Sequence, residues 1–328
     1  MPTNLPPEYF TVDKRYRAAT TTEEKIETLE ELIGTIPKHK GTDHLRADLR
    51  RKLSKLKDSM QKGKAGSRQV SAFSIKKEGA GQAAVVGPAN AGKSSLVAEL
   101  TNAQPEVAEY PFSTWNPMPG MMLIENVQVQ LIDTPPLNRD FIEPDLIDMI
   151  RRADLVLLTI DIQASPFDQL EETAAFLESH RIIPLHRKDD FPQDLRHTFR
   201  PFLIVVNKVD DETLVDDYTV FTELLDDAWH TVPISALTGY NVEQFKWTIF
   251  KLLKIIRIYS QAPGKEPDLN SPFVMQRGST IEEFAAQVHQ DIASDLKTSR
   301  VWGSADVDGQ MVGRDFVLKD GDVVELRA

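Results

Sequence analysis

Gly87-Pro88-Ala89-Asn90-Ala91-Gly92-Lys93-Ser94-Ser95 is the stretch that decides the fold of this chain. It matches the pattern G-x-x-x-x-G-K-[ST] of a phosphate-binding loop. The apolar run from Ala83 to Val86 precedes it and favours a buried strand, while Ser94 to Leu100 favours a helix. Between a strand and a helix, backbone N–H groups converge on an anion. A glycine-rich turn would need neither the lysine nor the serine, so the pattern predicts nucleotide binding.

Two side chains of this loop have predicted chemical roles. Lys93 is expected to contact the β- and γ-phosphates and to act in catalysis, and the Ser94 hydroxyl is expected to bind Mg²⁺. The other nucleotide-binding candidates of the loop act through their backbone or line it: Gly87, Asn90, Ala91, Gly92 and Ser95.

A second motif indicates which base the site binds. The apolar run Phe202 to Val206 ends in Asn207-Lys208-Val209-Asp210. The Asp210 carboxylate can accept two hydrogen bonds from guanine, from N1–H and from the amine, whereas adenine offers neither donor there. The same letters can form a polar turn, but their position after a phosphate loop favours GTP or GDP. Ser235-Ala236-Leu237 follows another apolar run and is placed to contact the guanine O6 through backbone N–H groups.

Two residues between these motifs are candidates for the Mg²⁺ shell. Asp133 ends the apolar stretch Val127 to Ile132, where a Mg²⁺-linked carboxylate is expected. Thr114, within Tyr110-Pro111-Phe112-Ser113-Thr114, offers a hydroxyl that could complete the shell when a γ-phosphate is present, and is a second catalytic candidate. A turn cap and a surface hydroxyl are the respective alternatives. The predicted metal ligands are therefore Ser94, Thr114 and Asp133.

These motifs resemble those of the Obg and HflX type of translation-factor GTPases. They are most similar to the branch called developmentally regulated GTP-binding proteins, which carry a C-terminal TGS domain. The tail from Gly313 to Leu326 and the stretch Ser299 to Gly303 are similar to the TGS ending, and Ile36 to Thr42 resembles the family's N-terminal region. The resemblance covers nearly the whole chain. It implies a Mg²⁺-dependent GTPase, with Asn90 placed where related enzymes hold a K⁺ ion.

The chain also departs from this family. The family pattern after the Mg²⁺-linked aspartate is D-x-P-G, and its glycine N–H contacts the γ-phosphate. Here the sequence is Asp133-Thr134-Pro135-Pro136, and proline has no N–H. Leu137 follows, in place of a water-orienting glutamine, and the stretch from Asp133 to Asn207 is too short for the family's extra domain. We therefore expect slow GTP hydrolysis; the alternative is a guanine-nucleotide-bound assembly factor with little or no hydrolysis.

Composition limits which classes of protein this chain can belong to. The chain has 328 residues, of which 41% are hydrophobic and 27% charged, as in soluble globular proteins. It has no cysteine, which fits a reducing compartment. The sequence shows no secretory pattern and no apolar run long enough to cross a bilayer. A cytoplasmic location is expected, with no membrane or DNA partner.

Charge is spread unevenly along the chain. The net charge is −12, yet residues 38–77 hold roughly 13 Lys and Arg against 3 Asp. We call residues 38–77 the basic arm. A basic arm on an acidic body favours RNA, and with a TGS domain it favours the ribosome or another structured RNA as partner. The alternative is a solvated helical face on an acidic protein.

Three domains are expected. Residues 1–72 should form a helical hairpin with a basic linker, because apolar residues recur at helical spacing from Thr21 to Ile36 and again after Thr42. Residues 73–261 alternate strands and helices, which predicts an α/β GTPase domain with a doubly wound, mostly parallel sheet. Its last helix is expected over Val242 to Ser260. Residues 262–328 show a β-α-β order that suits a small β-grasp fold, the TGS domain by resemblance.

Overall fold

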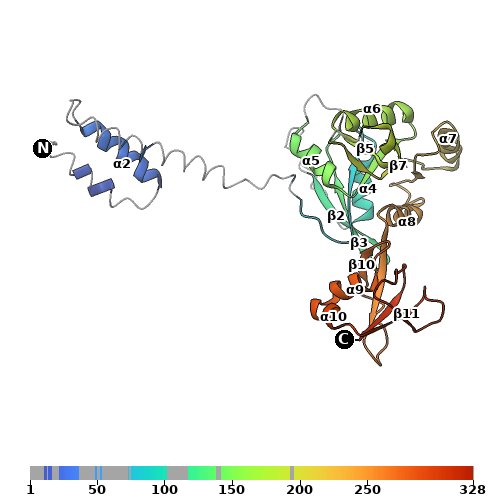
Figure 1. Ribbon diagram of the computed structural model, residues 1–328. Helices are drawn as coiled ribbons and strands as arrows, with labels where there is room; N and C mark the ends of the chain where they lie inside the picture. The colour runs from blue at the N-terminus through green and yellow to red at the C-terminus, as the bar shows by residue number, and fades with distance from the viewer. Residues whose placement is uncertain are drawn as a thin grey trace. The chain divides into compact units, whose positions relative to one another are not determined.

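The computed structural model describes residues 11–12, 14–16, 22–36, 49, 52–53, 73, 75–101, 117–137, 142–192 and 196–327 (Figure 1). The chain divides into two compact units, Met1–Ser71 and Ala72–Ala328. Thr114 and nearly all of the basic arm lie outside the described residues. No helix in the described ranges is long and apolar enough to cross a bilayer.

The first unit is built on helix α2, Thr22–Thr35, which confirms the helical spacing read from the sequence. Leu29 and Leu32 of this helix are fully buried, and they pack with Val12 and Leu49 in a small apolar core. Residues 11–12 and 14–16 are helical as well.

The second unit contains a six-stranded sheet in the order β2-β3-β1-β4-β7-β8. All neighbours in it are parallel except β2 and β3, which form an antiparallel hairpin. This confirms the predicted α/β fold with a mostly parallel sheet. The strands are β1 Gln82–Val86, β2 Met118–Ile124, β3 Val127–Asp133, β4 Leu155–Asp161, β7 Phe202–Asn207 and β8 Thr231–Pro233.

Helices cover both faces of this sheet, so its central strands are buried on both sides, as parallel strands usually are. Successive residues of β1 point to opposite faces: Ala84 and Val86 to one core, Ala83 and Val85 to the other. Helices α4 Lys93–Leu100 and α8 Val242–Leu252 pack on the second face. The first face is covered by α5 Pro144–Arg152, α6 Pro166–Ser179 and α7 Glu212–Glu223. Beside the sheet lie β5 Ile182–Pro184, the 3₁₀ helix η1 Leu185–Asp190 and β6 Thr198–Arg200.

A second, five-stranded sheet in the order β10-β9-β13-β11-β12 forms the C-terminal part. Its central strands β9 and β13 are parallel, and the outer pairs are antiparallel. Helix α9 packs against one face through Ile281 and Phe284, which are fully buried. The elements are β9 Ile255–Gln261, β10 Phe273–Gln276, α9 Ile281–Val288, α10 Gln290–Asp295, β11 Thr298–Trp302, β12 Gln310–Val312 and β13 Val323–Arg327.

The helix expected over Val242 to Ser260 is wrong in its second half. Helix α8 ends at Leu252, and Lys254 with φ 52° turns the chain into strand β9. Ile256 and Ile258 of this strand are buried in the C-terminal core, because alternate residues of a strand share a face. Since β9 pairs with β10 and β13, we propose that the boundary between the two domains lies between α8 and β9.

Arg257 of β9 links the two sheets. Its guanidinium donates to Asp320 at 2.8 Å and also to Glu125 in the turn between β2 and β3. It lies over the rings of Trp247 and Phe250 of α8, at 5.4 and 5.3 Å from their centroids. The hydrogen bonds that Arg257 donates to Asp320 and Glu125 raise its pKa despite its partial burial. The guanidinium is therefore charged and contacts two carboxylates and two aromatic rings.

Candidate nucleotide site

The predicted phosphate loop joins β1 to α4, as its sequence pattern requires. Gly87 has φ 149°, and a Cβ there would lie 2.2 Å from the carbonyl oxygen of Thr159. Gly92 has φ 84°, and its Cβ would lie 2.3 Å from Nδ2 of Asn207. Only glycine fits these two positions, because a side chain would clash with fixed atoms and adopt a disfavoured backbone. These two glycines of the motif therefore allow the loop to lie directly against β4 and β7.

Lys93 begins helix α4 and folds back over the loop. Its ammonium donates to the carbonyl oxygens of Pro88 at 2.6 Å and Gly87 at 3.1 Å. The side chain is 5% exposed, so its charge is concentrated inside the loop. A charge held there attracts phosphate oxygens. Of the other loop residues, Asn90 and Ser95 are exposed and Ala91 is buried.

Ser94 and Asp133 come together as predicted for metal ligands. The Ser94 hydroxyl donates to Asp133 Oδ2 at 2.6 Å. Asp133 is 4% exposed, and its other oxygen, Oδ1, is buried with no hydrogen-bond partner among the described residues. Burial raises the pKa of the Asp133 carboxyl, against the opposing effects of Ser94 and of the Lys93 charge. A divalent cation would supply the missing partner of Oδ1, so the donor set fits Mg²⁺.

The segment after Asp133 is packed against the body. Thr134, Pro135 and Pro136 are buried, and the Thr134 hydroxyl donates to the Val85 carbonyl oxygen at 2.8 Å. Leu137 is 4% exposed and belongs to the core under α5. The leucine side chain therefore faces the protein interior and offers nothing to a water molecule in the site.

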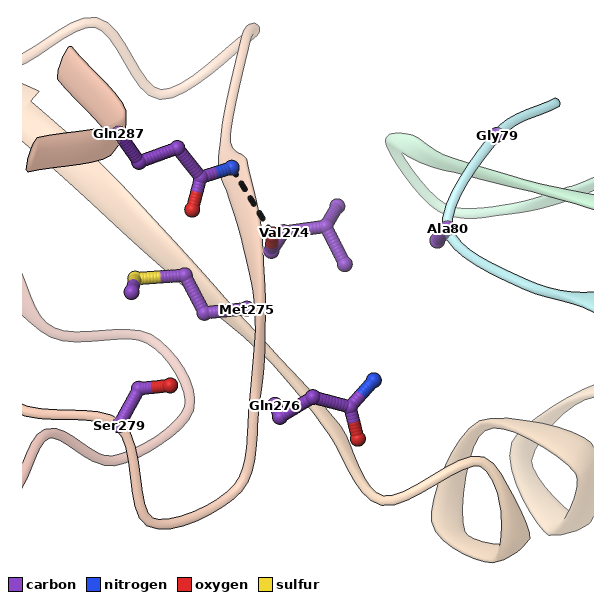
Figure 2. Close-up of a pocket in the computed structure, with 7 residues that line it drawn as sticks. All are labelled: Gly79, Ala80, Val274, Met275, Gln276, Ser279 and Gln287. Atoms are coloured by element: carbon purple, nitrogen blue, oxygen red, sulfur yellow. Dashed lines mark hydrogen bonds between the residues drawn. The ribbon is translucent and has the colours of Figure 1, made fainter. Parts of the chain in front are cut away.

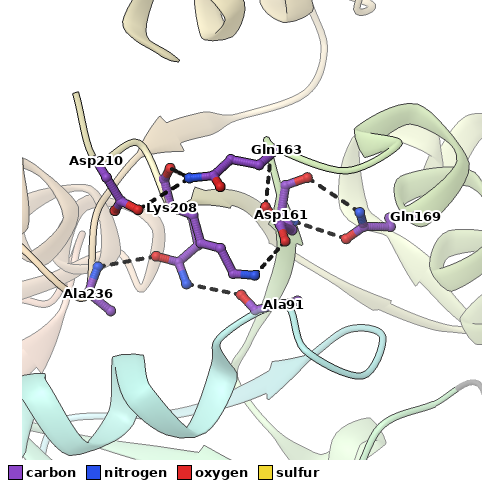
Figure 3. Close-up of polar contacts among 8 residues, drawn as sticks. Ala91, Asp161, Gln163, Gln169, Lys208, Asp210 and Ala236 are labelled. Carbon is purple, nitrogen blue, oxygen red and sulfur yellow. Dashed lines mark hydrogen bonds and ion pairs between the residues drawn. The ribbon is translucent and has the colours of Figure 1, made fainter. Parts of the chain in front are cut away.

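The predicted base element follows β7. Asp210 Oδ1 accepts a hydrogen bond from the Ser235 hydroxyl at 2.6 Å, so the serine orients the carboxylate. Asn207 is 1% exposed and bridges two loops: Nδ2 donates to the Ala91 carbonyl oxygen at 3.0 Å, and Oδ1 accepts from the Ala236 N–H at 3.2 Å. Figure 3 shows the two hydrogen bonds of this bridge, at Ala91 and at Ala236. These contacts join three segments in one site: the phosphate loop, the base element and Ser235–Ala236. The side chain of the next residue, Leu237, is 84% exposed.

Sequence reasoning missed the residues at the end of β4. Asp161 forms an ion pair with Lys208 Nζ at 2.5 Å. The Gln163 amide donates to the Lys208 carbonyl oxygen at 3.0 Å and to Asp210 Oδ2 at 3.2 Å. Gln169 of α6 holds the Asp161 backbone. The available clue was the apolar run from Leu155 to Ile162, which is typical of a buried strand in a parallel sheet. The carboxyl ends of neighbouring parallel strands lie at one edge of a sheet, so its last residues could have been placed beside Asn207.

A cavity of about 290 Å³ lies away from this site. It is lined by Gly79, Ala80, Val274, Met275, Gln276, Ser279 and Gln287 (Figure 2). The Gln287 amide donates across its rim to the Val274 carbonyl oxygen at 3.2 Å. None of the lining side chains is ionisable, so this cavity offers no acid, base or cation for chemistry.

Two family models match the chain. Residues 82–208 match a model described as 50S ribosome-binding GTPase, which spans the phosphate loop, Asp133 and Asn207. Residues 256–328 match the TGS domain, which begins within β9. A solved YchF GTPase structure from Schizosaccharomyces pombe has a similar fold, with a TM-score of 0.53 at 12% identity over 77% of this chain and 99% of that one.

Curated relatives are similar along almost their full length. An uncharacterized GTP-binding protein of Methanocaldococcus jannaschii is 28% identical over 93% of this chain and 92% of its own. Developmentally-regulated GTP-binding protein 1 of Xenopus laevis is 24% identical over 92% of this chain and 98% of its own. Ribosome-interacting GTPase 1 of Saccharomyces cerevisiae is 24% identical over 94% and 99%.

Proposed function

We propose that this chain, whose GTPase and TGS regions match known family models, hydrolyses GTP slowly and uses the bound nucleotide to control its association with the ribosome. The observation that carries the proposal is the buried Asp133 Oδ1, which has no hydrogen-bond partner within the described ranges and lies beside Ser94 and the loop that Lys93 closes. An orphaned buried carboxylate oxygen costs stability unless a ligand completes it. Mg²⁺ with a nucleotide phosphate supplies that completion.

The residues of this chain contribute to the reaction by binding the nucleotide and orienting its phosphates. Lys93 holds negative charge of the β- and γ-phosphates, and the backbone N–H groups at the start of α4 surround them. Ser94 and Asp133 would hold Mg²⁺, which neutralises charge that develops on the phosphates. Asp210, oriented by Ser235, selects guanine. Thr114 is proposed to complete the metal shell, and it lies outside the described residues.

The side chain that follows Pro136 supports a slow intrinsic rate. In Ras-type enzymes a glutamine orients the attacking water. Leu137 is apolar, 4% exposed and packed in the core, so it cannot do so. Water must then be positioned by backbone groups, by the substrate phosphate or by a partner. We therefore propose that an external partner accelerates hydrolysis.

The ribosome is the partner that the comparisons support. A relative along nearly the whole chain is named Ribosome-interacting GTPase 1, and the model that matches residues 82–208 is described as a ribosome-binding GTPase. The basic arm offers positive charge for ribosomal or other structured RNA on a chain whose net charge is −12. We propose that the arm and the TGS domain contact that RNA, and that the protein acts in the cytoplasm.

Pro136 favours a second candidate function. Without an N–H at this position, one contact that distinguishes GTP from GDP is missing. A guanine-nucleotide-bound assembly factor that scarcely hydrolyses GTP would tolerate this loss.

Single-turnover hydrolysis of GTP, with ribosomes present and absent, separates the two functions. The wild-type protein and Lys93→Ala are compared, because the variant removes the charge that faces the phosphates. We expect slow hydrolysis alone and faster hydrolysis with ribosomes, in the wild type only. An unchanged slow rate with ribosomes would favour the assembly factor.

A further inference from the structure

The carboxylate of Asp210 is engaged at both oxygens. Oδ1 accepts from the Ser235 hydroxyl at 2.6 Å. Oδ2 accepts from the amide nitrogen of Gln163 at 3.2 Å, a contact that Figure 3 shows. Ser235 is fully buried, whereas Gln163 is exposed. The serine is therefore a fixed partner of the carboxylate, and the glutamine approaches it from the solvent side.

Gln163 is anchored by its backbone, and its side chain reaches over the base element. The Gln163 N–H donates to Asp161 Oδ1 at 2.9 Å, and Asp161 Oδ2 is paired with Lys208 at 2.5 Å. The side-chain amide donates to both the Lys208 carbonyl oxygen and Asp210. Because the backbone is held and the amide is exposed, the side chain can rotate away without disturbing β4.

The amide of Gln163 resembles the group that Asp210 is proposed to recognise. Both the carboxamide and the guanine amine are planar –NH₂ groups that donate to a carboxylate oxygen. A carboxylate oxygen can accept two hydrogen bonds, so Oδ1 can take the guanine N1–H beside the Ser235 hydroxyl. The guanine amine and the Gln163 amide then need the same solvent-facing side of Oδ2. Binding of guanine then requires that one hydrogen bond be exchanged for another.

We propose that Gln163 is a specificity-determining residue that occupies the acceptor for the guanine amine when no base is bound. The inference rests on the proposed guanine site. It makes Gln163 an intramolecular competitor, which lowers affinity for GDP and GTP by the same factor because the base is common to both. Inosine keeps the N1–H donor but has no amine. With an inosine nucleotide bound, Gln163 therefore keeps its bond to Asp210.

Calorimetric titration of the full-length protein with GDP and with inosine diphosphate (IDP) tests whether Gln163 competes with the guanine amine. Gln163→Ala removes the competitor, so GDP should bind about two- to fivefold more tightly, the effect of one exposed hydrogen bond. IDP affinity should not change, because the glutamine bond is lost from the free and bound states alike. Gln163→Met, which keeps the length of the side chain without a donor, should behave as Gln163→Ala does.

Gln169→Ala is the matched control. It removes the same kind of amide from the same network, yet Gln169 bonds the Asp161 backbone and not Asp210. Its ratio of GDP to IDP affinity should equal that of the wild type. Weaker GDP binding by Gln163→Ala, or an equal gain for GDP and IDP, would overturn the proposal. Failure of the guanine site itself would appear differently, as a wild-type protein that does not prefer GDP to ADP.

Discussion

The N–H of Leu137 donates to the carbonyl oxygen of Gly87 at 3.4 Å, so the segment after Asp133 is tied to the first residue of the phosphate loop. The Thr134 hydroxyl adds a second tie, to Val85 of β1. Both hydrogen bonds join the protein to itself. A ligand shifts a conformational equilibrium only by its difference in affinity for the two states. A segment already fixed by the protein offers little such difference between GTP and GDP.

Pro136→Gly should restore part of the response to the γ-phosphate. Glycine returns an N–H donor at the position where the family pattern has one, and one hydrogen bond to a charged group contributes about 1.5–3 kcal/mol. The preference for a non-hydrolysable GTP analogue over GDP should therefore rise about tenfold or more. Equilibrium binding of the two nucleotides measures it. Pro135→Gly serves as control, since it removes the neighbouring proline and should leave the preference unchanged; equal preferences in all three proteins would refute the argument.

Asn90 leads to a prediction about monovalent cations. It is exposed in the phosphate loop with φ 64°, at the position where the resemblance to this family implies a K⁺ ion. We predict faster GTP hydrolysis in K⁺ than in Na⁺ at equal ionic strength. Asn90→Gly keeps the backbone conformation accessible but removes the side-chain oxygen, so it should abolish the difference. Identical rates in the two salts for the wild type would mean that Asn90 only shapes the loop.

The basic arm should matter for RNA and not for nucleotide. Deletion of residues 1–71 removes one compact unit and leaves the phosphate loop and the base element intact. GDP affinity should stay the same, while binding to ribosomes should weaken and lose much of its dependence on salt, because each phosphate contact adds to that dependence. Sedimentation with ribosomes over a range of salt concentrations measures both. The same affinity and salt dependence in the truncated protein would identify the arm as a solvated face.

Arg257 should contribute to the stability of the second unit. Its side chain is 11% exposed, and it bonds Asp320 and Glu125 while lying over two aromatic rings. Arg257→Ala leaves Asp320 without its charged partner and should lower the free energy of unfolding by about 2–4 kcal/mol. Urea denaturation measures this change. Arg314→Ala is the control, since that side chain is 47% exposed and should cost less than about 1 kcal/mol; equal effects would contradict the role given to Arg257.

The sequence predicted the parts of the site that are encoded locally. The phosphate loop and Asn207–Asp210 are short motifs, each after a buried apolar strand, and the structure places them at one edge of one sheet. Apolar runs also predicted most of the central strands within one to three residues. These features depend on neighbours in the chain, which a pattern can register.

Features that depend on distant pairing were missed. Ile255 and Ile256 continue the apolar spacing of α8, and pairing with Gln276 and Met275 of β10 makes this segment a strand. Gln163 gave no signal, because its contact with Asp210 depends on where its side chain points after β4 ends. Likewise, the sequence revealed that Pro136 lacks a donor, but not that Leu137 is tied to Gly87.

The central claim is that one site, closed by Asp210, binds guanine nucleotides, and Asp210→Asn tests it most directly. Asparagine presents an amide where guanine needs an acceptor, so GDP affinity should fall about a hundredfold, whereas xanthosine diphosphate, whose base carries an oxygen in place of the amine, should gain on it. Asp211→Asn is the matched control. Asp211 caps α7 through Thr213 and Leu214, so its change should leave both affinities unaltered.

Titration of both nucleotides against the three proteins gives the answer. The account predicts that the wild type and Asp211→Asn prefer GDP, and that Asp210→Asn prefers xanthosine diphosphate or loses its preference for GDP. An equal loss of affinity for both bases in Asp210→Asn would show that this carboxylate does not contact the base and would contradict the account.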